Sequence, residues 1–452
     1  MSELTQSQRG TGAQMPDELL EHAARAVELA REVGADDVFA KVAWGRSSEL
    51  QWRAGKLEKL QESESLELGL RLYVDGRYSA HGTNDLADED RLRRFVSDAV
   101  ELTRALEPDP YREITDPALF ADLEQHELDT VDASLADLTP ERRIELAREV
   151  AAAAEADDAV ISATAVVFDS SGASALVGSN GFSGAKQGTS LWYGAEATVS
   201  DGEKRPEASR YVGAPHAADL PTPTEVGAEA LARALGRRGA SKAESRKGTM
   251  ILDREAAPSF LGRILGALSA GAIQQGQSFL AESMDQPIAS SLLTLTDDPF
   301  RPRSGSSRTF DGDGIALHRR PVIESGTLRT FYVDPYYGKK LGLQANGGSA
   351  TNLVFEHGEH DTAGLIAAAG EAILVDSWLG GNANMTSGDF SFGIRGRIVR
   401  GGELAEAVTE MNITGNYADL LKQIVAIGND PLPWSTFRSP AVVFEDVSFS
   451  GT

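Results

Sequence analysis

The chain has 452 residues, of which 41% are hydrophobic and 25% charged, and its 68 acidic and 43 basic side chains give a formal net charge of −25. A surface this acidic repels phosphate backbones and anionic lipid, so we expect neither direct nucleic-acid binding nor membrane binding. The sequence contains no cysteine, which excludes disulfides, thiolate nucleophiles and thiolate-bound metals.

The first segment of the chain carries no periodic apolar pattern. Residues 1–15 are polar and lack the apolar core of a signal peptide, so we expect a flexible tail and a cytoplasmic protein. Amphipathic helices are then predicted over 16–34 and 86–106, because apolar residues recur there at helical spacing. Between them, residues 65–82 are predicted to form two paired strands, because apolar residues alternate with others from Leu66 to Val74. Asp75-Gly76 is the two-residue hairpin turn between these strands.

The same order of elements occurs a second time. After a connection near 108–138, Thr139 and Pro140 begin a predicted helix that continues to residue 156. Strands are predicted from residue 159 to about 211, and a further helix over 223–239. An internal duplication and a common layer arrangement would both give this order.

A charged, small-residue stretch at 236–248 is the best domain boundary. We therefore expect a tail over 1–15, an N-terminal α/β domain over 16–238 and a β-rich C-terminal domain over 245–452. The fold class is α+β, with a helix and antiparallel-sheet domain followed by a mostly β domain that holds a few helices. One of these helices is predicted over 416–428 and another in the apolar stretch 259–280.

Standard catalytic motifs are absent from the chain. It has no phosphate-binding loop, no dinucleotide fingerprint, no Gly-x-Ser-x-Gly elbow and no His-Glu-x-x-His. Its one local histidine pair, His357 and His360, has a glycine between its members, and we interpret it as a solvated turn. The Asp-Gly-Asp-Gly run at 311–314 is a tight turn and not a calcium loop, because Val322 stands where a ligating Glu is needed.

Several longer segments of the C-terminal half carry a family resemblance. They are "PSFLGRILGALSAGAIQQGQSFL", "RTFDGDGI", "PVIESGTLRTFYVDPYYGKKLGL", "TSGDFSFGIRGRIVRGGELAEAVTEMNITGN" and "IVAIGND", with a weaker match in "GLRLYVDGRYSAHGTNDL". Through them the chain resembles the TldD/PmbA family of peptidase-related proteins over most of its length.

The resemblance implies a two-subunit zinc protease. In TldD-type chains the helix in the 259–280 region carries His-Glu-x-x-x-His, and these histidines hold zinc together with a distant Cys. This chain has other residues there, namely Arg263, Ile264, Leu265, Gly266, Ala267 and Leu268. It therefore resembles the PmbA type, also called TldE, in which the zinc ligands are missing. We expect no catalytic residue, metal ligand or cofactor in this chain, and zinc in a TldD-like partner.

Three functions follow as hypotheses. The first is a metal-free subunit that forms part of the cavity wall and binds unfolded or leader peptides, which could add as a strand to a sheet edge. The second is a homodimer that binds peptides without cutting them. The third is a metal-independent hydrolase that uses Asp376, Asp389 and Glu410.

Five polar residues on or near the 259–280 helix and the glycine-rich strands are candidates for the cavity lining. They are Arg263, Gln275, Asn384, Asp389 and Asn412. The alternative interpretation is that these five are surface or turn residues.

Overall fold

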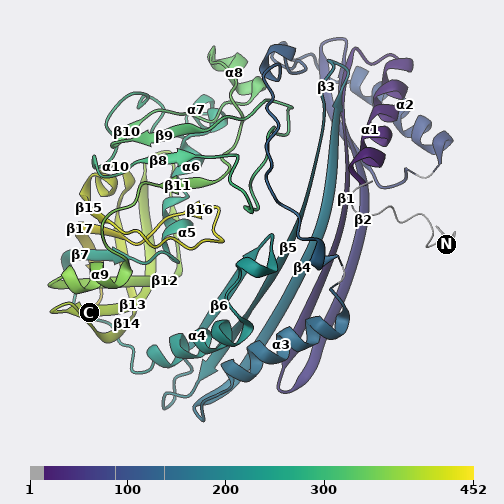
Figure 1. The fold of residues 1–452 in the computed structure, drawn as a ribbon. Coiled ribbons are helices and arrows are strands. Elements are labelled where there is room, and N and C mark those ends of the chain that lie inside the picture. The colour runs from purple at the N-terminus through teal and green to yellow at the C-terminus, as the bar shows by residue number, and fades with distance from the viewer. Residues whose placement is uncertain (1–14, 87, 137) are drawn as a thin grey trace.

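The computed structural model of the chain describes residues 15–86, 88–136 and 138–452. It shows a long, curved N-terminal sheet with helices packed against it and a β-rich C-terminal domain beside it (Figure 1). The predicted tail, residues 1–15, lies outside the described residues except for Met15, which begins α1. Among the described helices, none combines the length and the apolarity needed to cross a membrane.

The N-terminal sheet has six described strands in the order β3-β2-β1-β4-β5-β6, and every neighbouring pair is antiparallel. The strands are β1 (Asp37–Arg53), β2 (Lys56–Val74), β3 (Arg77–Thr83), β4 (Val160–Gly178), β5 (Ser183–Val199) and β6 (Glu207–Ala214). Asp75 and Gly76 form the predicted hairpin turn with φ of 50° and 73°. Ala54 and Gly55 form a second turn of this kind, which the sequence did not predict.

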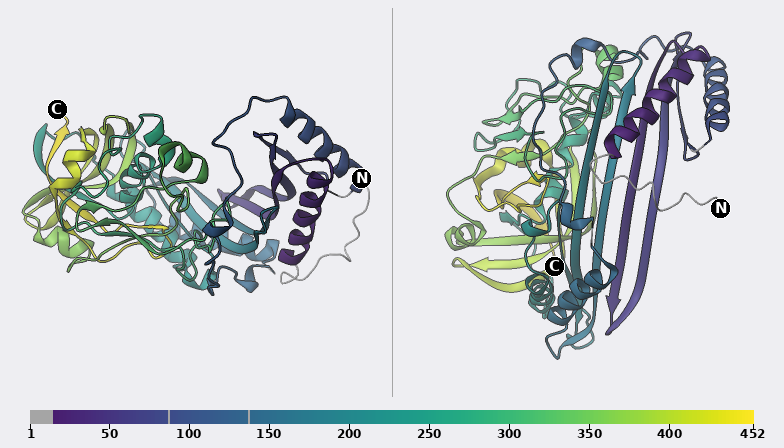
Figure 2. Two further views of the ribbon diagram at one scale, coloured as in Figure 1. Left: turned by 90° about the horizontal axis from the view of Figure 1, so that it is seen from above. Right: turned by 45° about the vertical axis from the view of Figure 1, so that its right-hand side comes forward.

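Four helices cover one face of this sheet in two pairs (Figure 2). They are α1 (Met15–Glu32), α2 (Glu89–Arg104), α3 (Pro140–Ala154) and α4 (Pro223–Gly236). The predicted cap of α3 is present, because the Thr139 hydroxyl accepts from the Arg142 N–H at 3.2 Å. Since side chains alternate along a strand, the buried Val38, Ala40 and Val42 of β1 all face the helices.

The C-terminal domain contains two sheets and confirms the predicted α+β class. One sheet consists of β8 (Leu295–Asp297), β9 (Arg320–Glu324), β10 (Thr327–Leu328), β11 (Leu353–Phe355) and β16 (Phe437–Arg438). The other consists of β7 (Arg246–Leu252), β12 (Glu371–Ala383), β13 (Asp389–Arg400), β14 (Glu403–Asn416), β15 (Ile424–Ile427) and β17 (Val442–Ser450). A further pairing of β14 with β17 closes five of these strands into a ring.

The helices of this domain are short, and one prediction about them is wrong. They include α8 (Pro335–Leu341), α9 (Thr362–Ala368) and α10 (Tyr417–Leu420). The helix expected over 416–428 ends after one turn and a 3-10 segment, Leu421–Gln423, and continues as strand β15. The reason is tertiary, because Ile424 and Ile427 pair with β17 and are buried in the C-terminal cores.

The segment between α2 and the 3-10 turn Ala133–Leu135 crosses from one end of the sheet toward the other (Figure 1). We call residues 106–132 the strap. It bonds to both domains: the Thr115 hydroxyl donates to the Asp313 carbonyl at 2.7 Å, and the Thr189 N–H of β5 donates to the Thr130 carbonyl at 3.0 Å. These bonds attach the strap to both domains. Its one described helical element is the 3-10 turn Pro117–Leu119.

Among the direct contacts between the domains, two lie at opposite ends of the sheet. At one end of the sheet, Phe310 packs edge-on against Phe182 with ring centroids 5.1 Å apart, in a cluster with Phe39. At the other end, Glu255 accepts from Arg210 of β6 and from Arg233 of α4. Burial would raise the pKa of Glu255, but these two arginines hold it below its usual value.

A second acidic group, Asp253, lies two residues before Glu255 and leads into α5. Its side chain accepts the Glu255 N–H at 2.8 Å, and its carbonyl accepts the Ala256 and Ala257 N–H groups. Burial raises the pKa of Asp253 to about 6, although nearby arginines partly oppose this. The two acids before α5 therefore carry pKa shifts of opposite sign.

Inside the N-terminal domain, Arg143 of α3 and Asp169 of β4 form a buried, two-pronged ion pair. Arg143 is 1% exposed, and its Nη2 donates to Asp169 Oδ2 at 3.0 Å. We predict that Arg143→Ala lowers the free energy of unfolding by about 3 kcal/mol or more, because Asp169 is left buried without its partner. The neighbouring Arg142 is exposed, so Arg142→Ala should cost less than about 1 kcal/mol. Urea unfolding measures both, and equal costs would contradict the prediction.

Asp253 gives a prediction about pH. Because the folded protein keeps the Asp253 proton up to about pH 6 and the unfolded chain loses it near pH 4, stability falls as pH rises through this window. Asp253→Asn removes the cost of the buried charge and should raise the melting temperature at about pH 8, with a smaller gain at about pH 5. Asp389→Asn is the control, because hydrogen bonds lower the pKa of Asp389, and it should give no gain at the higher pH. A gain for Asp253→Asn that is independent of pH would refute the assignment.

Candidate functional site

The segment that resembles the zinc-motif region is not one helix, contrary to the prediction over 259–280. It forms α5 (Ala257–Leu261), α6 (Ile264–Ala267) and α7 (Ala270–Gln274). The break before α7 has a visible cause: Tyr332 donates its N–H to the Leu268 carbonyl and accepts the Ala270 N–H, each at 2.9 Å. These backbone groups bond across to Tyr332 and cannot continue the helical ladder, and Ser269 caps α7 instead.

One side of this segment forms the centre of the C-terminal core. Phe260 is fully buried and contacts four aromatic side chains with ring centroids 5.0–5.4 Å away, Trp378, Phe390, Phe392 and Tyr417. The Tyr417 hydroxyl donates to the Phe260 carbonyl at 2.9 Å, and Trp378 Nε1 donates to the Ala256 carbonyl at 3.1 Å. Aromatic packing and these two bonds therefore fix α5 in position.

The other side of the segment is exposed and carries few functional groups. Arg263 is exposed and lies over the Phe392 ring, 5.0 Å from its centroid. Gly266 is exposed near Met385 of the β12–β13 connection. Gln275 follows α7 and donates to the Tyr337 hydroxyl of α8 at 3.0 Å. A cation held on an aromatic face and two neutral residues offer no metal ligand on this surface.

Two of the predicted cavity residues meet at the turn between β12 and β13. The Asn384 N–H donates to the Asp389 carbonyl at 2.8 Å. The Asp389 carboxylate accepts from the Ser387 hydroxyl at 2.7 Å and from Asn416 Nδ2 at 2.9 Å. These two hydrogen bonds, Ser387 first, hold the pKa of Asp389 below its usual value. Asp389 is thus a stable, exposed carboxylate and is poorly suited to act as a general base.

The fifth predicted residue, Asn412, is exposed in the middle of β14 and pairs in register with Gly393 and Ser450. Sequence reasoning missed Asn416, which caps α10 through the Ala418 N–H and also bonds Asp389. Its position before an apolar helical turn was a signal for a cap, but nothing in the sequence indicated its contact with the hairpin.

The three carboxylates of the hydrolase hypothesis do not converge. Asp376 lies at a bulge of β12 and Glu410 at a bulge of β14, and both strands flank Arg395 of β13. Asp389 stands six residues from Arg395, which is about 20 Å along an extended strand. Asp376 accepts from Ser377 and lies 3.6 Å from Arg237, and Glu410 lies 3.9 Å from Lys242. Each of these two carboxylates therefore lies beside a basic side chain of its own, and Asp389 lies apart from both.

Metal ligands do not gather anywhere in the described part of the chain. No three His, Cys, Asp or Glu side chains there lie close enough together to hold an ion. His357 and His360 are both exposed, in the loop between β11 and α9.

Comparisons with known proteins identify the family. Sequence models of the PmbA/TldA metallopeptidase match its domain 1 at residues 41–103, its central domain at 133–238 and its C-terminal domain at 245–451. Metalloprotease PmbA of Escherichia coli O157:H7 is 27% identical over 96% of both chains. A PmbA homologue of Haemophilus influenzae shows the same identity and coverage.

Solved structures agree with this result. A Bacteroides thetaiotaomicron protein described as a candidate modulator of DNA gyrase superposes with a TM-score of 0.93 at 36% identity, over 96% of this chain and 99% of that chain. TldE of Thermococcus kodakarensis has the same fold, with a TM-score of 0.85 at 19% identity over 95% of this chain and 100% of that chain. The chain is therefore a PmbA/TldE-like member of the PmbA/TldD metallopeptidase family.

Proposed function

We propose that this chain is the metal-free subunit of a cytoplasmic, two-subunit metalloprotease. It pairs with a TldD-like subunit that holds the zinc, forms part of the wall of their shared cavity and binds unfolded or leader peptides for cleavage. Zinc would supply an activated water in the partner, and no catalytic step is assigned to this chain.

The exposed side of α5 and α6 carries the proposal. Its exposed residues, Arg263 and Gly266, offer neither an imidazole nor a carboxylate, the groups that the resemblance places in this region of a zinc subunit. The sequence has no cysteine to complete such a ligand set. The segment is nevertheless held in place by the aromatic side chains that pack around Phe260. A rigid segment of this kind can form part of the cavity wall.

A free sheet edge supports the role in peptide binding. The β5–β6 pairing runs only from Leu191 to Thr198, so the Ser183–Ser190 half of β5 has no neighbouring strand on that side. The strap occupies part of this edge: the Thr130 carbonyl accepts the Thr189 N–H, and the Thr130 hydroxyl donates to the Gln187 carbonyl. An extended peptide can bond to the remaining unpaired backbone groups as an added strand.

The first prediction concerns zinc. Chain purified without chelator should hold well below one zinc per molecule, because its exposed histidines stand without converging ligands. Metal analysis by mass spectrometry checks this, and the double variant His357→Ala/His360→Ala should give the same content. One tightly bound zinc per chain that disappears in the double variant would contradict the assignment.

The second prediction concerns cleavage. Alone, the chain should not cut an unfolded peptide. Mixed with a TldD-like subunit from the same organism it should raise that subunit's cleavage rate, and a chelator should abolish the activity of the pair. A quenched fluorescent peptide reports both rates.

The outcomes of this assay separate the three hypotheses. Chelator-insensitive cleavage by the chain alone would refute the proposal. Peptide binding by a homodimer, with no effect on any TldD-like subunit, would establish the peptide-binding alternative. Asp376→Asn and Glu410→Gln serve as controls and should leave the activity of the pair unchanged, because each carboxylate lies beside a basic side chain of its own.

A further inference from the structure

A chamber of about 1010 Å³ lies between the long sheet, the strap and the C-terminal domain. Its floor consists of small residues from the middle of three neighbouring strands. They are Gly45 and Ser47 of β1, Ser170, Gly172 and Ser174 of β4, and Gly188 and Ser190 of β5. The strap contributes residues 125 and 126 and 128–131, and the loop before Phe310 contributes 305–309. A space of this size can hold several residues of an extended peptide.

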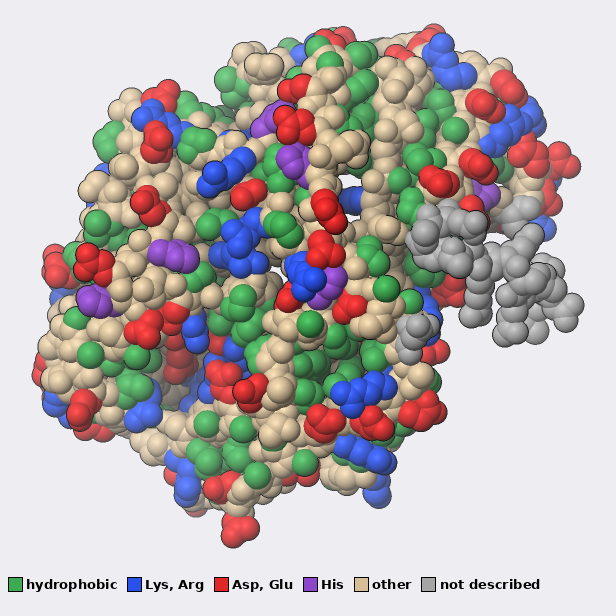
Figure 3. All heavy atoms as spheres, in the orientation of Figure 1, with side chains coloured by type: hydrophobic (Ala, Val, Ile, Leu, Met, Phe, Trp, Pro, Cys, Tyr) green, Lys and Arg blue, Asp and Glu red, His purple; other side chains and the backbone are tan. Residues whose placement is uncertain are grey.

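The charge of the chamber is opposite to that of the protein. Three basic side chains line it, Lys41, Lys186 and Arg308. Across the described residues none of the three lies within ion-pair distance of a carboxylate, whereas the chain as a whole has an acidic excess of 25. The one acidic lining residue, Asp129, is already paired with Arg303. Figure 3 shows Lys and Arg side chains in the middle of the molecule, beside openings between the domains.

The strand register brings two of these cations to one face. Lys41 pairs with Leu176 of β4, and Lys186 pairs with Ser174 from the other side. Because Leu176 and Ser174 are two residues apart, their partners point to the same face, and the two strands lie about 10 Å apart. Burial lowers the pKa of Lys186, and so does the positive charge of Arg308 and Lys41. The three cations therefore repel one another.

Arg308 faces this pair from the C-terminal domain and is held in place. Its Nη2 donates to the Ser349 hydroxyl at 3.0 Å and to the Ala350 carbonyl at 3.1 Å. The two carboxylates that interact with it most strongly, Asp297 and Asp311, are buried and accept backbone N–H groups. These acids are fixed in the protein and cannot close over the lysines.

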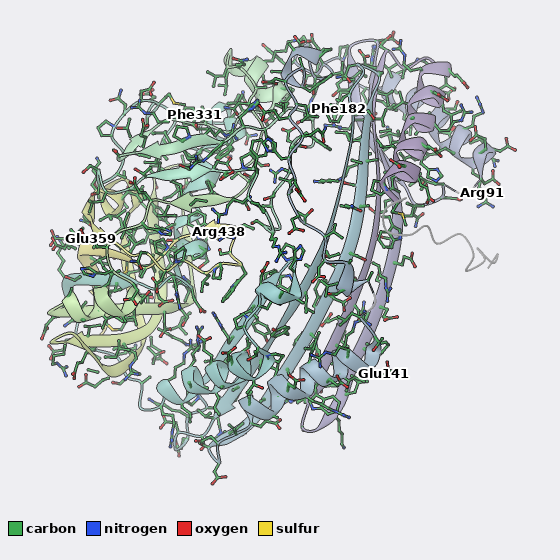
Figure 4. All side chains as sticks on the ribbon, viewed as in Figure 1. Arg91, Glu141, Phe182, Phe331, Glu359 and Arg438 are labelled. Carbon is green, nitrogen blue, oxygen red and sulfur yellow. The ribbon has the colours of Figure 1, made fainter. Side chains whose placement is uncertain are left out.

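Arg301 of the same loop and Arg438 of β16 form a second pair of arginines with no carboxylate within ion-pair distance among the described residues. Arg301 and Arg438 lie near each other, and the Nε atom of each is buried without a hydrogen bond. Burial, and next the charge of Arg301, lower the pKa of Arg438 to about 10. Figure 4 places Arg438 on the side of the C-terminal domain that faces the long sheet. Both arginines are half-exposed and lie outside the chamber lining, so they add positive charge to this side of the domain but are not assigned to the site.

We propose that this chamber binds carboxylate groups of the peptide, with Lys41, Lys186 and Arg308 as its anion-binding residues. The proposal rests on the proposed role in peptide binding and names the preferred substrate class, peptides that present carboxylates to the chamber. Two sources share this chemistry, acidic side chains and a free C-terminus. Opposite charge within a partly enclosed space gives the interaction its strength, and added salt weakens it.

The test is fluorescence anisotropy with three labelled peptides of equal length. One is acidic and C-terminally amidated, one is neutral with a free C-terminus, and one is neutral and amidated. We expect the first or the second to bind at least roughly tenfold more tightly than the third, which corresponds to one good ion pair. Equal affinity for all three would overturn the proposal.

Two double variants with the same change in net charge locate the site. Lys41→Gln/Lys186→Gln should lose the preference for carboxylate peptides. Lys56→Gln/Lys422→Gln, both at exposed positions outside the chamber, should keep it. The first variant should also melt no lower than the wild type, because it relieves repulsion between cations, so lost binding cannot be attributed to unfolding. Equal loss in both variants would indicate nonspecific attraction and would refute the site.

A cleavage assay on the complex of this chain with a TldD-like subunit distinguishes the chamber proposal from the proposed protease role. If the pair cuts neutral amidated peptide as fast as the carboxylate peptides, the chamber proposal fails and the protease role stands. If the pair cuts nothing while the chain alone still prefers carboxylate peptides through Lys41 and Lys186, the chamber proposal stands and the protease role fails.

Discussion

The antiparallel pairing of β1 with β4 is the contact on which the rest of the molecule depends. It runs without interruption from Phe39 to Arg53 and joins two units that each have the order helix, three strands, helix. Because the strands are antiparallel, each gives one half of its length to the α1–α2 core and the other half to the core beneath α3 and α4. Between these two apolar ends, the middle of the sheet is left with glycine and serine.

The attachment of the second domain follows from this division. Phe310 inserts at one end of the sheet beside Phe39 and Phe182, and Glu255 is bound by two arginines at the other end. The second domain spans the polar middle of the sheet without packing against it. The chamber therefore lies over the part of the sheet that has the fewest apolar side chains. The same Glu255 begins the turn that leads to α5, which ties the position of the candidate site to the edge of the N-terminal sheet.

The sequence predicted the parts of this structure that depend on local pattern. The helices around Leu19, Val96 and Val150, the turn at Asp75 and the cap at Thr139 all follow from spacing and residue type. Long-range partners decided the rest. Tyr332 interrupts the α5–α7 segment, and β17 turns residues 424–427 into a strand.

The site was predicted less well for the same reason. Asn384 and Asp389 do share a turn, but Asn416, which bonds to Asp389, comes from a strand end far along the chain. The chamber cations were not among the candidates at all, because Lys41, Lys186 and Arg308 lie in three distant stretches of ordinary polarity. The register of β1, β4 and β5 brings the two lysines together, and a loop of the other domain brings Arg308 to them; neither is visible in a single sequence.

The strap has a consequence for what can enter the chamber. Since it is bonded to Asp313 near one end and to β5 near the other, it closes a loop with the sheet and the helices that it connects, and hydrogen bonds complete this loop. A folded domain of about 100 residues has a radius of gyration of about 13 Å, far too large for a chamber of about 1010 Å³, whereas a short extended stretch of chain fits. The fold itself would then select unfolded polypeptides over folded ones, whatever side chains they carry.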